Sequence, residues 1–266
     1  ETSHIFNFEV GGASAIAGAM IRPIEGKNGI FAASQVEDAL RPPLRHSPKS
    51  RVVVVEQTSN LGGGSVWTLE MLNSIKDIAR NSDLIVHMDG ARLMNAVVAS
   101  GISAKDYASC TDTAWIDLSK GLGCPIGGVL TGTRAFIEEA WFWKQRLGGA
   151  MRQSGIMAAA GIFALKNNVS RLAEDHENAQ VFVERLSQID GIELKSKNIE
   201  TNIIFFTVNT LNINAVQLSS SLLDQGIRIN VTGENSVRAV THMDVDRKSV
   251  IEAADAIGQI LLRNTS

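Results

Sequence analysis

The first half of the chain alternates short apolar runs with stretches of helical periodicity. Predicted strands, in which β-branched and other apolar residues dominate, cover residues 51–55, 84–88, 113–118 and 127–130. Between the first two strands, residues 68–80 place Leu72 and Ile75 on one helical face. Apolar strands separated by helices predict an α/β fold, with a mostly parallel sheet that helices cover on both faces.

The pattern changes after residue 149. Helices are predicted over residues 154–165, 169–189, 215–225 and 246–262, and strands over 202–208, 227–231 and 237–241. The helix over 154–165 is so rich in Ala, Ile and Met that we expect it to be buried. The mixture of strands and helices near the end predicts a small α+β domain. We therefore expect a large domain over residues 1–169 and a small C-terminal domain over residues 170–266.

Composition narrows the choice of partners. The chain has 266 residues and a net charge of -3, without the basic stripe that nucleic acid or an anionic membrane surface requires. No apolar run approaches the length of a membrane span. The two cysteines, Cys110 and Cys124, are too few for a disulfide framework and fit a reducing compartment. We expect a cytoplasmic protein whose partner is a small molecule.

Polar residues collect where the predicted strands end. The first strand runs into residues 56–60, the second into 89–92, and the third into 119–123, a Gly-rich turn that contains Lys120. In an open α/β sheet, ligands bind at the carboxyl ends of the strands. Three strands therefore bring an acid, an amide, an arginine and a lysine to one edge, where we expect a small-molecule site.

Lys120 and Asp89 form the most informative pair at this edge. A lysine in a Ser-Lys-Gly turn is, taken alone, more often an exposed turn residue. Asp89, however, closes an apolar strand 31 residues upstream. Lysine and carboxylate together are what pyridoxal phosphate needs, because the lysine amine attacks the aldehyde and the acid keeps the pyridine nitrogen protonated. The pair predicts a pyridoxal-phosphate site.

Four segments in fixed order carry a resemblance to a known family. They are residues 87–96 (HMDGARLMNA), 117–127 (DLSKGLGCPIG), 148–155 (GGAMRQSG) and 237–242 (VRAVTH). Each resembles a motif of the threonine aldolases, which are fold-type-I pyridoxal-phosphate enzymes of the β-eliminating lyase group. The similarity runs from about His4 to the end of the chain.

The resemblance implies a role for each matching residue. Lys120 corresponds to the lysine that forms a Schiff base with pyridoxal 5'-phosphate, and Asp89 to the acid that pairs with the ring nitrogen. The other cofactor contacts implied are His4 on the ring face, Ser119 and Arg152 at the phosphate, and Arg92 near the cofactor oxygen. Arg238 matches the arginine that binds the substrate carboxylate, and the resemblance implies that Arg92 contributes to substrate binding as well. No metal site is expected, since the lysine-centred pattern accounts for the nearby histidines.

The sequence departs from the family pattern in two places. Where the family usually has a histidine over the β-hydroxyl of the substrate, this chain has Ser59, which can hydrogen-bond a hydroxyl but is a poor base. The chain also begins just before His4, without the family's N-terminal segment and its phosphate-binding turn. We interpret it as a fragment or a shortened protein.

The expected activity is cleavage of β-hydroxy-α-amino acids, such as threonine or allo-threonine, to glycine and an aldehyde. Ser59 favours an alternative that keeps the cofactor but changes the bond broken: racemisation, transaldol transfer or β-elimination. The short N-terminus favours another, a truncated non-catalytic homologue. Trp141 and Trp143 lie at helical spacing with Phe136, so we expect these side chains in a core or an interface. Because large apolar patches usually mark interfaces, we also expect a homodimer or homotetramer with Arg152 at the interface.

Overall fold

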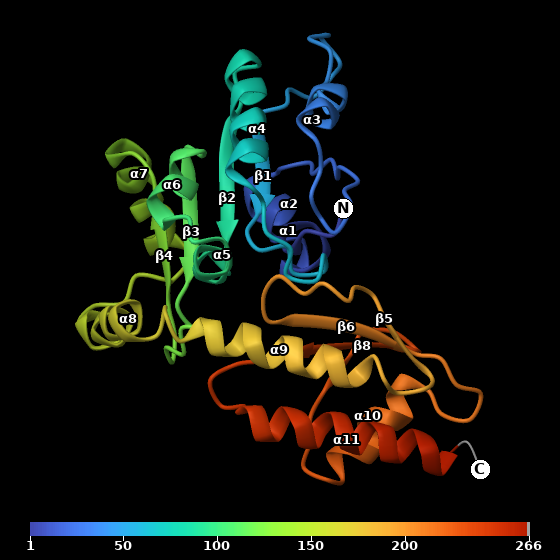
Figure 1. The fold of residues 1–266 in the computed structure, drawn as a ribbon. Helices are drawn as coiled ribbons and strands as arrows, with labels where there is room; N and C mark the ends of the chain where they lie inside the picture. The colour runs from blue at the N-terminus through green and yellow to red at the C-terminus, as the bar shows by residue number, and fades with distance from the viewer. Residues whose placement is uncertain (265–266) are drawn as a thin grey trace. The chain divides into compact units, whose positions relative to one another are not determined.

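In the computed structural model of the protein, which describes residues 1–264, the chain forms two compact units. They are Glu1–Ser170 and Arg171–Ser266 (Figure 1). No helix within the described residues has the length and apolar content needed to cross a membrane.

The first unit is built on a four-stranded sheet. Its strands, in order across the sheet, are β1 (Val52–Glu56), β2 (Ile85–Gly90), β3 (Thr113–Asp117) and β4 (Gly128–Thr131). The first three run parallel and β4 runs antiparallel to β3. In register, Asp89 of β2 lies opposite Glu56 of β1 and Trp115 of β3. The prediction of a mostly parallel sheet in an α/β fold is confirmed.

Helices pack on the parallel part of this sheet (Figure 1). They are α3 (Ala33–Ala39), α4 (Leu69–Asn81), α5 (Leu93–Ser100) and α6 (Ala104–Ser109). The α4 helix begins at Thr68, whose hydroxyl accepts a hydrogen bond from the backbone N–H of Met71 at 3.2 Å. Its apolar residues recur at helical spacing, so Leu72 and Ile75 are buried against Val86 and Met88 of β2. Each such side chain contributes about 1.5–3 kcal/mol by burial.

The remaining elements of the first unit are largely exposed. They are α1 (His4–Asn7), the 3-10 helix η1 (Glu9–Gly11), α2 (Gly12–Ala17), β4, α7 (Arg134–Arg146) and α8 (Gly155–Asn167). The prediction that the helix over 154–165 is buried is wrong for this chain, because in α8 only Gly161 and Ala164 are buried while Ile156 is 71% exposed. Trp141 and Trp143 are also exposed, which corrects the core interpretation of α7. Apolar composition alone does not distinguish a core from an uncovered interface.

The second unit has an antiparallel sheet of four strands. Its order is β5 (Ile192–Leu194), β6 (Ile203–Val208), β8 (Ser236–Val240) and β7 (Asn230–Val231). Its helices are α9 (Leu172–Leu186), α10 (Ala215–Leu223) and α11 (Arg247–Asn264). Helix and sheet residues share one core, which includes Phe182, Phe206, Leu218, Val237 and Ile257. The unit is therefore an α+β structure, as predicted, with β5 as an additional strand.

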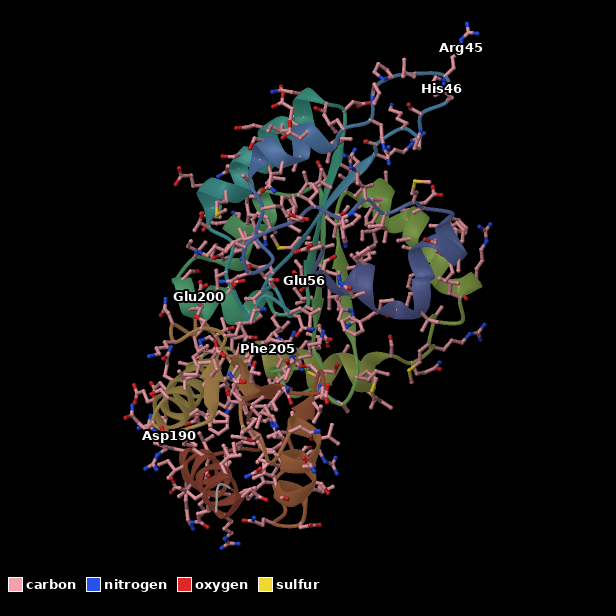
Figure 2. All side chains as sticks on the ribbon, turned by 90° about the vertical axis from the view of Figure 1, so that its right-hand side faces the viewer. Arg45, His46, Glu56, Asp190, Glu200 and Phe205 are labelled. Carbon is pink, nitrogen blue, oxygen red and sulfur yellow. The ribbon has the colours of Figure 1, made fainter. Side chains whose placement is uncertain are left out.

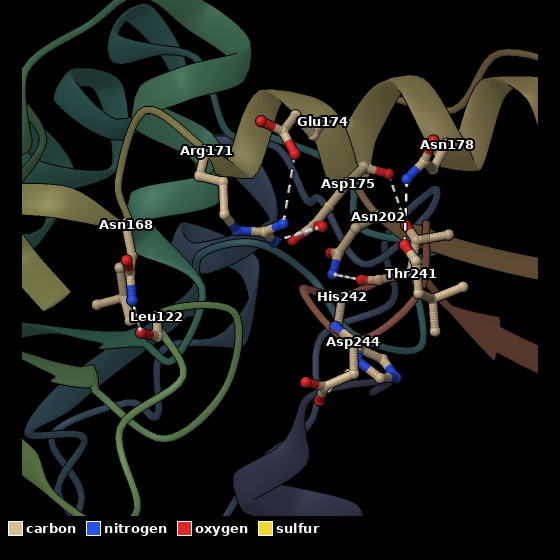
Figure 3. A network of polar contacts seen from close by, with 11 residues as sticks. Leu122, Asn168, Arg171, Glu174, Asp175, Asn178, Asn202, Thr241, His242 and Asp244 are labelled. Atoms are coloured by element: carbon tan, nitrogen blue, oxygen red, sulfur yellow. Dashed lines mark hydrogen bonds and ion pairs between the residues drawn. The ribbon is translucent and has the colours of Figure 1, made fainter. Parts of the chain in front are cut away.

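A buried polar network ties α9 to the sheet of the second unit (Figure 3). The Arg171 guanidinium donates to Asp175 Oδ1 at 2.5 Å, and the Thr241 hydroxyl donates to the backbone oxygen of Asp175 at 2.6 Å. The amide nitrogen of Asn202 donates to the Thr241 carbonyl at 2.8 Å. Burial raises the pKa of Asp175 although the Arg171 charge opposes the shift. Next to it, burial lowers the pKa of His176 to about 4.

Candidate active site

Asp89 and Lys120 lie at the carboxyl ends of neighbouring parallel strands. Asp89 is in β2, is 8% exposed, and its Oδ1 accepts a hydrogen bond from the N–H of Ala91 at 3.2 Å. Lys120 follows the end of β3, and β3 pairs with β2 in parallel with Trp115 opposite Asp89. The topology of the sheet therefore places a buried carboxylate and a lysine at one edge, as the sequence predicts.

The amine of Lys120 is held by an aspartate to which the sequence pattern gave no role. Lys120 Nζ lies 3.0 Å from Asp117 Oδ2 and 5.6 Å from the centroid of the Trp115 ring. The other carboxylate oxygen, Asp117 Oδ1, accepts hydrogen bonds from both the N–H and the hydroxyl of Ser119, each at 2.7 Å. Burial alone would raise the pKa of Asp117, but the hydrogen bonds from Ser119 and Lys120 outweigh it and hold this pKa below its usual range.

Glu56 joins the start of the chain to the end of β1 and lies inside the first unit (Figure 2). Its Oε2 accepts the backbone N–H of His4 at 2.5 Å, and its Oε1 accepts the N–H of Asn60 at 2.7 Å. Burial raises the pKa of Glu56, and the charge of Asp89 adds to the effect. The His4 ring itself lies 4.8 Å from the Phe8 ring, and His4 Nδ1 is 2.8 Å from a carboxylate oxygen of Glu9. The structure thus brings His4 to the strand-end region.

Ser59 lies in the loop after β1 and is 1% exposed. Its N–H donates to the Ser65 carbonyl at 3.0 Å, and its own carbonyl accepts the N–H of Gly64 at 2.8 Å. Its hydroxyl is pressed against two glycines: a Cβ added to Gly29 would lie 1.9 Å from Ser59 Oγ, and one added to Gly62 would lie 2.6 Å away. Gly29 also has a φ of +78°, which favours glycine. The small side chain at position 59 is therefore part of a tightly packed turn.

The three arginines that the sequence singled out occupy different surroundings. Arg92 precedes α5, its N–H donates to the Gln57 carbonyl at 3.0 Å, and it lines a small pocket together with Asp117 and Gly121. Arg152 is exposed between α7 and α8. Arg238 belongs to the second unit, where it lies on β8 opposite Phe205 of β6 and burial lowers its pKa.

Asp117 and Glu56 are functional candidates to which the sequence interpretation gave no specific role, although it placed residues 56–60 at the ligand-binding edge. Both stand at the last position of a strand, Glu56 in β1 and Asp117 in β3. Asp117 has one usable sequence signal, since it precedes Lys120 by three residues. For Glu56 the partners are backbone N–H groups, one of them 52 residues away, and no residue pattern reports such contacts.

The donor set at this edge suits an aldehyde cofactor with a ring nitrogen and a phosphate. A buried carboxylate at Asp89 matches a protonated ring nitrogen, the Lys120 amine matches the aldehyde, and the Ser119 hydroxyl is a phosphate donor. A small pocket joins the turn after β2 to the turn after β3, since both Arg92 and Gly121 line it. The residues present therefore fit pyridoxal phosphate.

Comparison with known proteins identifies the family. Residues 1–209 match the beta-eliminating lyase family, and the chain belongs to it. The chain is 38% identical over 255 residues to a low-specificity L-threonine aldolase of Escherichia coli K12, covering 96% of this chain and 74% of that one. It is 32% identical over 269 residues to an alanine racemase of Cochliobolus carbonum, covering 97% and 67%.

The fold is shared with a solved threonine aldolase of Leishmania major. The TM-score is 0.79 at 18% sequence identity, and the match covers 98% of this chain and 75% of that one. The family resemblance and the fold class inferred from the sequence are thereby confirmed. The roles of individual residues stay predictions.

Proposed function

We propose that this chain is a pyridoxal-phosphate-dependent aldolase that cleaves β-hydroxy-α-amino acids, such as threonine and allo-threonine, to glycine and an aldehyde. The observation that carries the proposal is the placement of Asp89 and Lys120 at the ends of the neighbouring parallel strands β2 and β3. Family membership and the similarity to the Escherichia coli aldolase support it. In this view the first unit is the cofactor-binding domain and the second the small domain.

In this proposal, each contact with the cofactor comes from a residue of the first unit. Lys120 bonds to its aldehyde, Asp89 holds the ring nitrogen protonated, and His4 covers one face of the ring. Ser119 and Arg152 bind the phosphate, and Arg92 lies near the cofactor oxygen. Once bound, pyridoxal phosphate supplies an electron sink for the carbanion left at Cα when a bond to that carbon breaks. The buried position of Asp89 keeps water from weakening its pairing with the ring.

Substrate recognition rests on Arg238 and Ser59, with Arg92 near the carboxylate. A guanidinium binds a carboxylate with two parallel hydrogen bonds, which fixes the orientation of an amino acid. Arg238 is half-buried, and a partly desolvated guanidinium binds an anion more strongly than an exposed one. The Ser59 hydroxyl orients the β-hydroxyl of the substrate and does not act as a strong base near neutral pH.

The assembly that we propose is a homodimer or a homotetramer, with Arg152 contributing to a phosphate site at the interface. The exposed apolar side chains of α7 and α8 support it: Trp141 is 51% exposed, Phe142 63%, Ile156 71% and Phe163 62%. Exposed apolar areas of this extent are typical of interfaces. We place the protein in the cytoplasm, because Cys110 and Cys124 are both free thiols.

A second candidate is an amino-acid racemase that uses the same cofactor site. Two observations favour it: the 32% identity to an alanine racemase, and Ser59, which cannot remove a hydroxyl proton as readily as a histidine. Both candidates require Lys120 and Asp89, so only the products separate them.

The test is to add pyridoxal phosphate to the purified chain and follow both cofactor attachment and products. We expect a visible absorbance band that borohydride removes while it attaches the cofactor permanently to Lys120. Lys120→Ala should abolish both the band and the attachment, and Lys49→Ala at an exposed ion pair should retain both. L-Threonine or L-allo-threonine should yield glycine and acetaldehyde. Formation of D-alanine from L-alanine without glycine from threonine would favour the racemase. An unchanged band in Lys120→Ala, with cofactor that borohydride still attaches to the protein, would overturn the site assignment for either activity.

A further inference from the structure

Asp117 is positioned to control the amine of Lys120. We propose that the Asp117 carboxylate is the resting partner of this lysine: it pairs with the Lys120 ammonium ion at the sheet edge, so that the amine becomes reactive toward an aldehyde only after the pair opens and a proton is lost to solvent. The ion pair is a property of the free chain, whereas its consequence for the reaction rests on the proposed function. Asp117 is thus a positioning residue for the lysine.

The backbone fixes the Asp117 carboxylate in place. Asp117 is the last residue of β3 and lies opposite Gly128 of β4. The next N–H, that of Leu118, donates to the Gly127 carbonyl at 2.9 Å, so the chain remains anchored beyond the strand. Because Ser119 occupies Oδ1 with two hydrogen bonds, it is Oδ2 that faces Lys120 Nζ at 3.0 Å. The carboxylate is 14% exposed and the lysine 35% exposed, so the pair is partly shielded from water.

The two side chains of this pair attract each other by opposite charge. The hydrogen bonds that keep the pKa of Asp117 low leave it ionised at neutral pH, and an anion 3.0 Å away stabilises an ammonium ion. The Trp115 ring, 5.6 Å from Nζ, adds a weaker attraction for a cation. An ammonium ion has no free electron pair and cannot attack a carbonyl. While this ion pair is closed, Lys120 therefore does not attack a carbonyl group.

The loss of this proton needs no reagent other than water. When the ion pair opens, one proton moves from Lys120 Nζ to solvent, which breaks an N–H bond and frees the electron pair of the nitrogen. The partial exposure of both side chains gives water access to the pair. The neutral amine would then be able to bond to the aldehyde carbon of the cofactor, and the two protons that remain on the nitrogen would leave with the aldehyde oxygen as water.

The experiment measures amine reactivity in the chain without cofactor. Trace labelling with acetic anhydride at pH 7.5, followed by peptide mass spectrometry, gives the rate at Lys120 relative to Lys248, whose 3.6 Å pair with Glu252 is exposed. In Asp117→Asn we expect the Lys120 rate to rise about threefold to tenfold, since a partly shielded ion pair is lost. The matched control is Asp112→Asn at the other end of β3, where the carboxylate accepts the Val86 N–H, and it should leave the Lys120 rate unchanged.

A reciprocal measurement covers the case in which Asp117→Asn does not fold. Lys120→Met should raise the pKa of Asp117, read from the NMR titration of its labelled carboxyl carbon, because the attraction of the ammonium is removed. An unchanged Lys120 rate in folded Asp117→Asn, or an unchanged Asp117 titration in Lys120→Met, would overturn the proposal. Failure of borohydride to fix any cofactor at Lys120 would instead overturn the proposed function and leave the labelling result intact.

Discussion

Glu56 and Asp89 lie directly opposite each other on the parallel strands β1 and β2, so two largely buried carboxylates share one edge of the sheet. The two carboxylates have different hydrogen-bond partners. Glu56 accepts hydrogen bonds from the backbone N–H groups of His4 and Asn60, whereas Asp89 accepts one from the N–H of Ala91. The first carboxylate therefore holds the start of the chain in place, and the second is the one assigned to the ligand.

Glu56→Gln should loosen the segment around His4. A glutamine has one amide oxygen for two N–H donors, and its NH₂ group faces the other donor, so we expect the free energy of unfolding to fall by about 1–3 kcal/mol at pH 7. Cleavage by added protease within residues 1–20 should also become faster. Urea unfolding and limited proteolysis measure the two effects, with Glu70→Gln on the exposed face of α4 as the control. Equal stability and equal cleavage in both variants would contradict the anchoring role.

Asp89→Asn should separate cofactor binding from turnover. The amide keeps the size of the side chain, and Lys120 is unchanged, so cofactor should still attach. Turnover should fall about 100-fold or more, roughly 3 kcal/mol, because a neutral amide does not keep the ring nitrogen protonated. Bound cofactor by absorbance and glycine release from threonine are the two measurements. Turnover within about twofold of the wild type would remove Asp89 from its assigned role.

Ser59→Ala should affect only substrates that carry a β-hydroxyl. Alanine is smaller than serine, so the packing against Gly29 and Gly62 is kept. Loss of one hydrogen bond to the substrate should lower kcat/KM for threonine about fivefold to tenfold. Any racemisation of alanine should be unchanged, since alanine has no hydroxyl. Ser74→Ala on α4, where the serine is exposed, is the matched control. An equal loss for both substrates would assign Ser59 to the fold and not to recognition.

His176 should make the stability of the protein depend on pH. Burial lowers its pKa from 6.5 to about 4, so between these values the unfolded chain binds a proton that the folded chain does not. The contribution is complete above pH 6.5 and is lost as the pH falls toward about 4. For a partly buried ring we expect about 1–2 kcal/mol. Urea unfolding from pH 7.5 to pH 4.5 should show a flatter profile in His176→Gln but not in His46→Gln, at an exposed loop position (Figure 2).

Periodicity was enough to locate most elements of this fold. The prediction for β1 followed from four consecutive valines, and that for α4 from Leu72 and Ile75 at helical spacing. The strand β5 (Ile192–Leu194) was missed because it has only three residues, with a glutamate in the middle, and periodicity needs a longer window. For α8 the helix was predicted and its burial was wrong, since an apolar helix has the same composition in a core and at an interface.

The candidate site was predictable to the extent that it depends on strand ends. Asp89 and Lys120 were found because Asp89 lies at the end of one apolar strand and Lys120 in the turn that follows the next, and parallel strands end at one edge. The link between Lys120 and Asp117, and that between His4 and Glu56, were not found. Both depend on how the backbone turns after a strand, which residue types alone do not encode.

Arg152 provides the test of a site shared between subunits. It is exposed beside the apolar surface of α7 and α8, where a second copy of the chain would cover it. If each site takes Lys120 from one subunit and Arg152 from its partner, neither Lys120→Ala nor Arg152→Ala alone should be active. In a random mixture, however, about a quarter of the dimer sites receive both wild-type residues.

We therefore expect mixing of Lys120→Ala with Arg152→Ala to restore up to about a quarter of the wild-type activity. Mixing Lys120→Ala with Asp89→Asn is the matched control and should restore none, because both residues belong to the first unit of one chain and no mixed site contains both. Sedimentation shows whether the active species is a dimer or a larger assembly, and subunit exchange is followed with one labelled partner. A fully active monomer, or the absence of restored activity despite complete exchange, would show that each chain builds its own site and that the exposed apolar surface of α7 and α8 does not complete it.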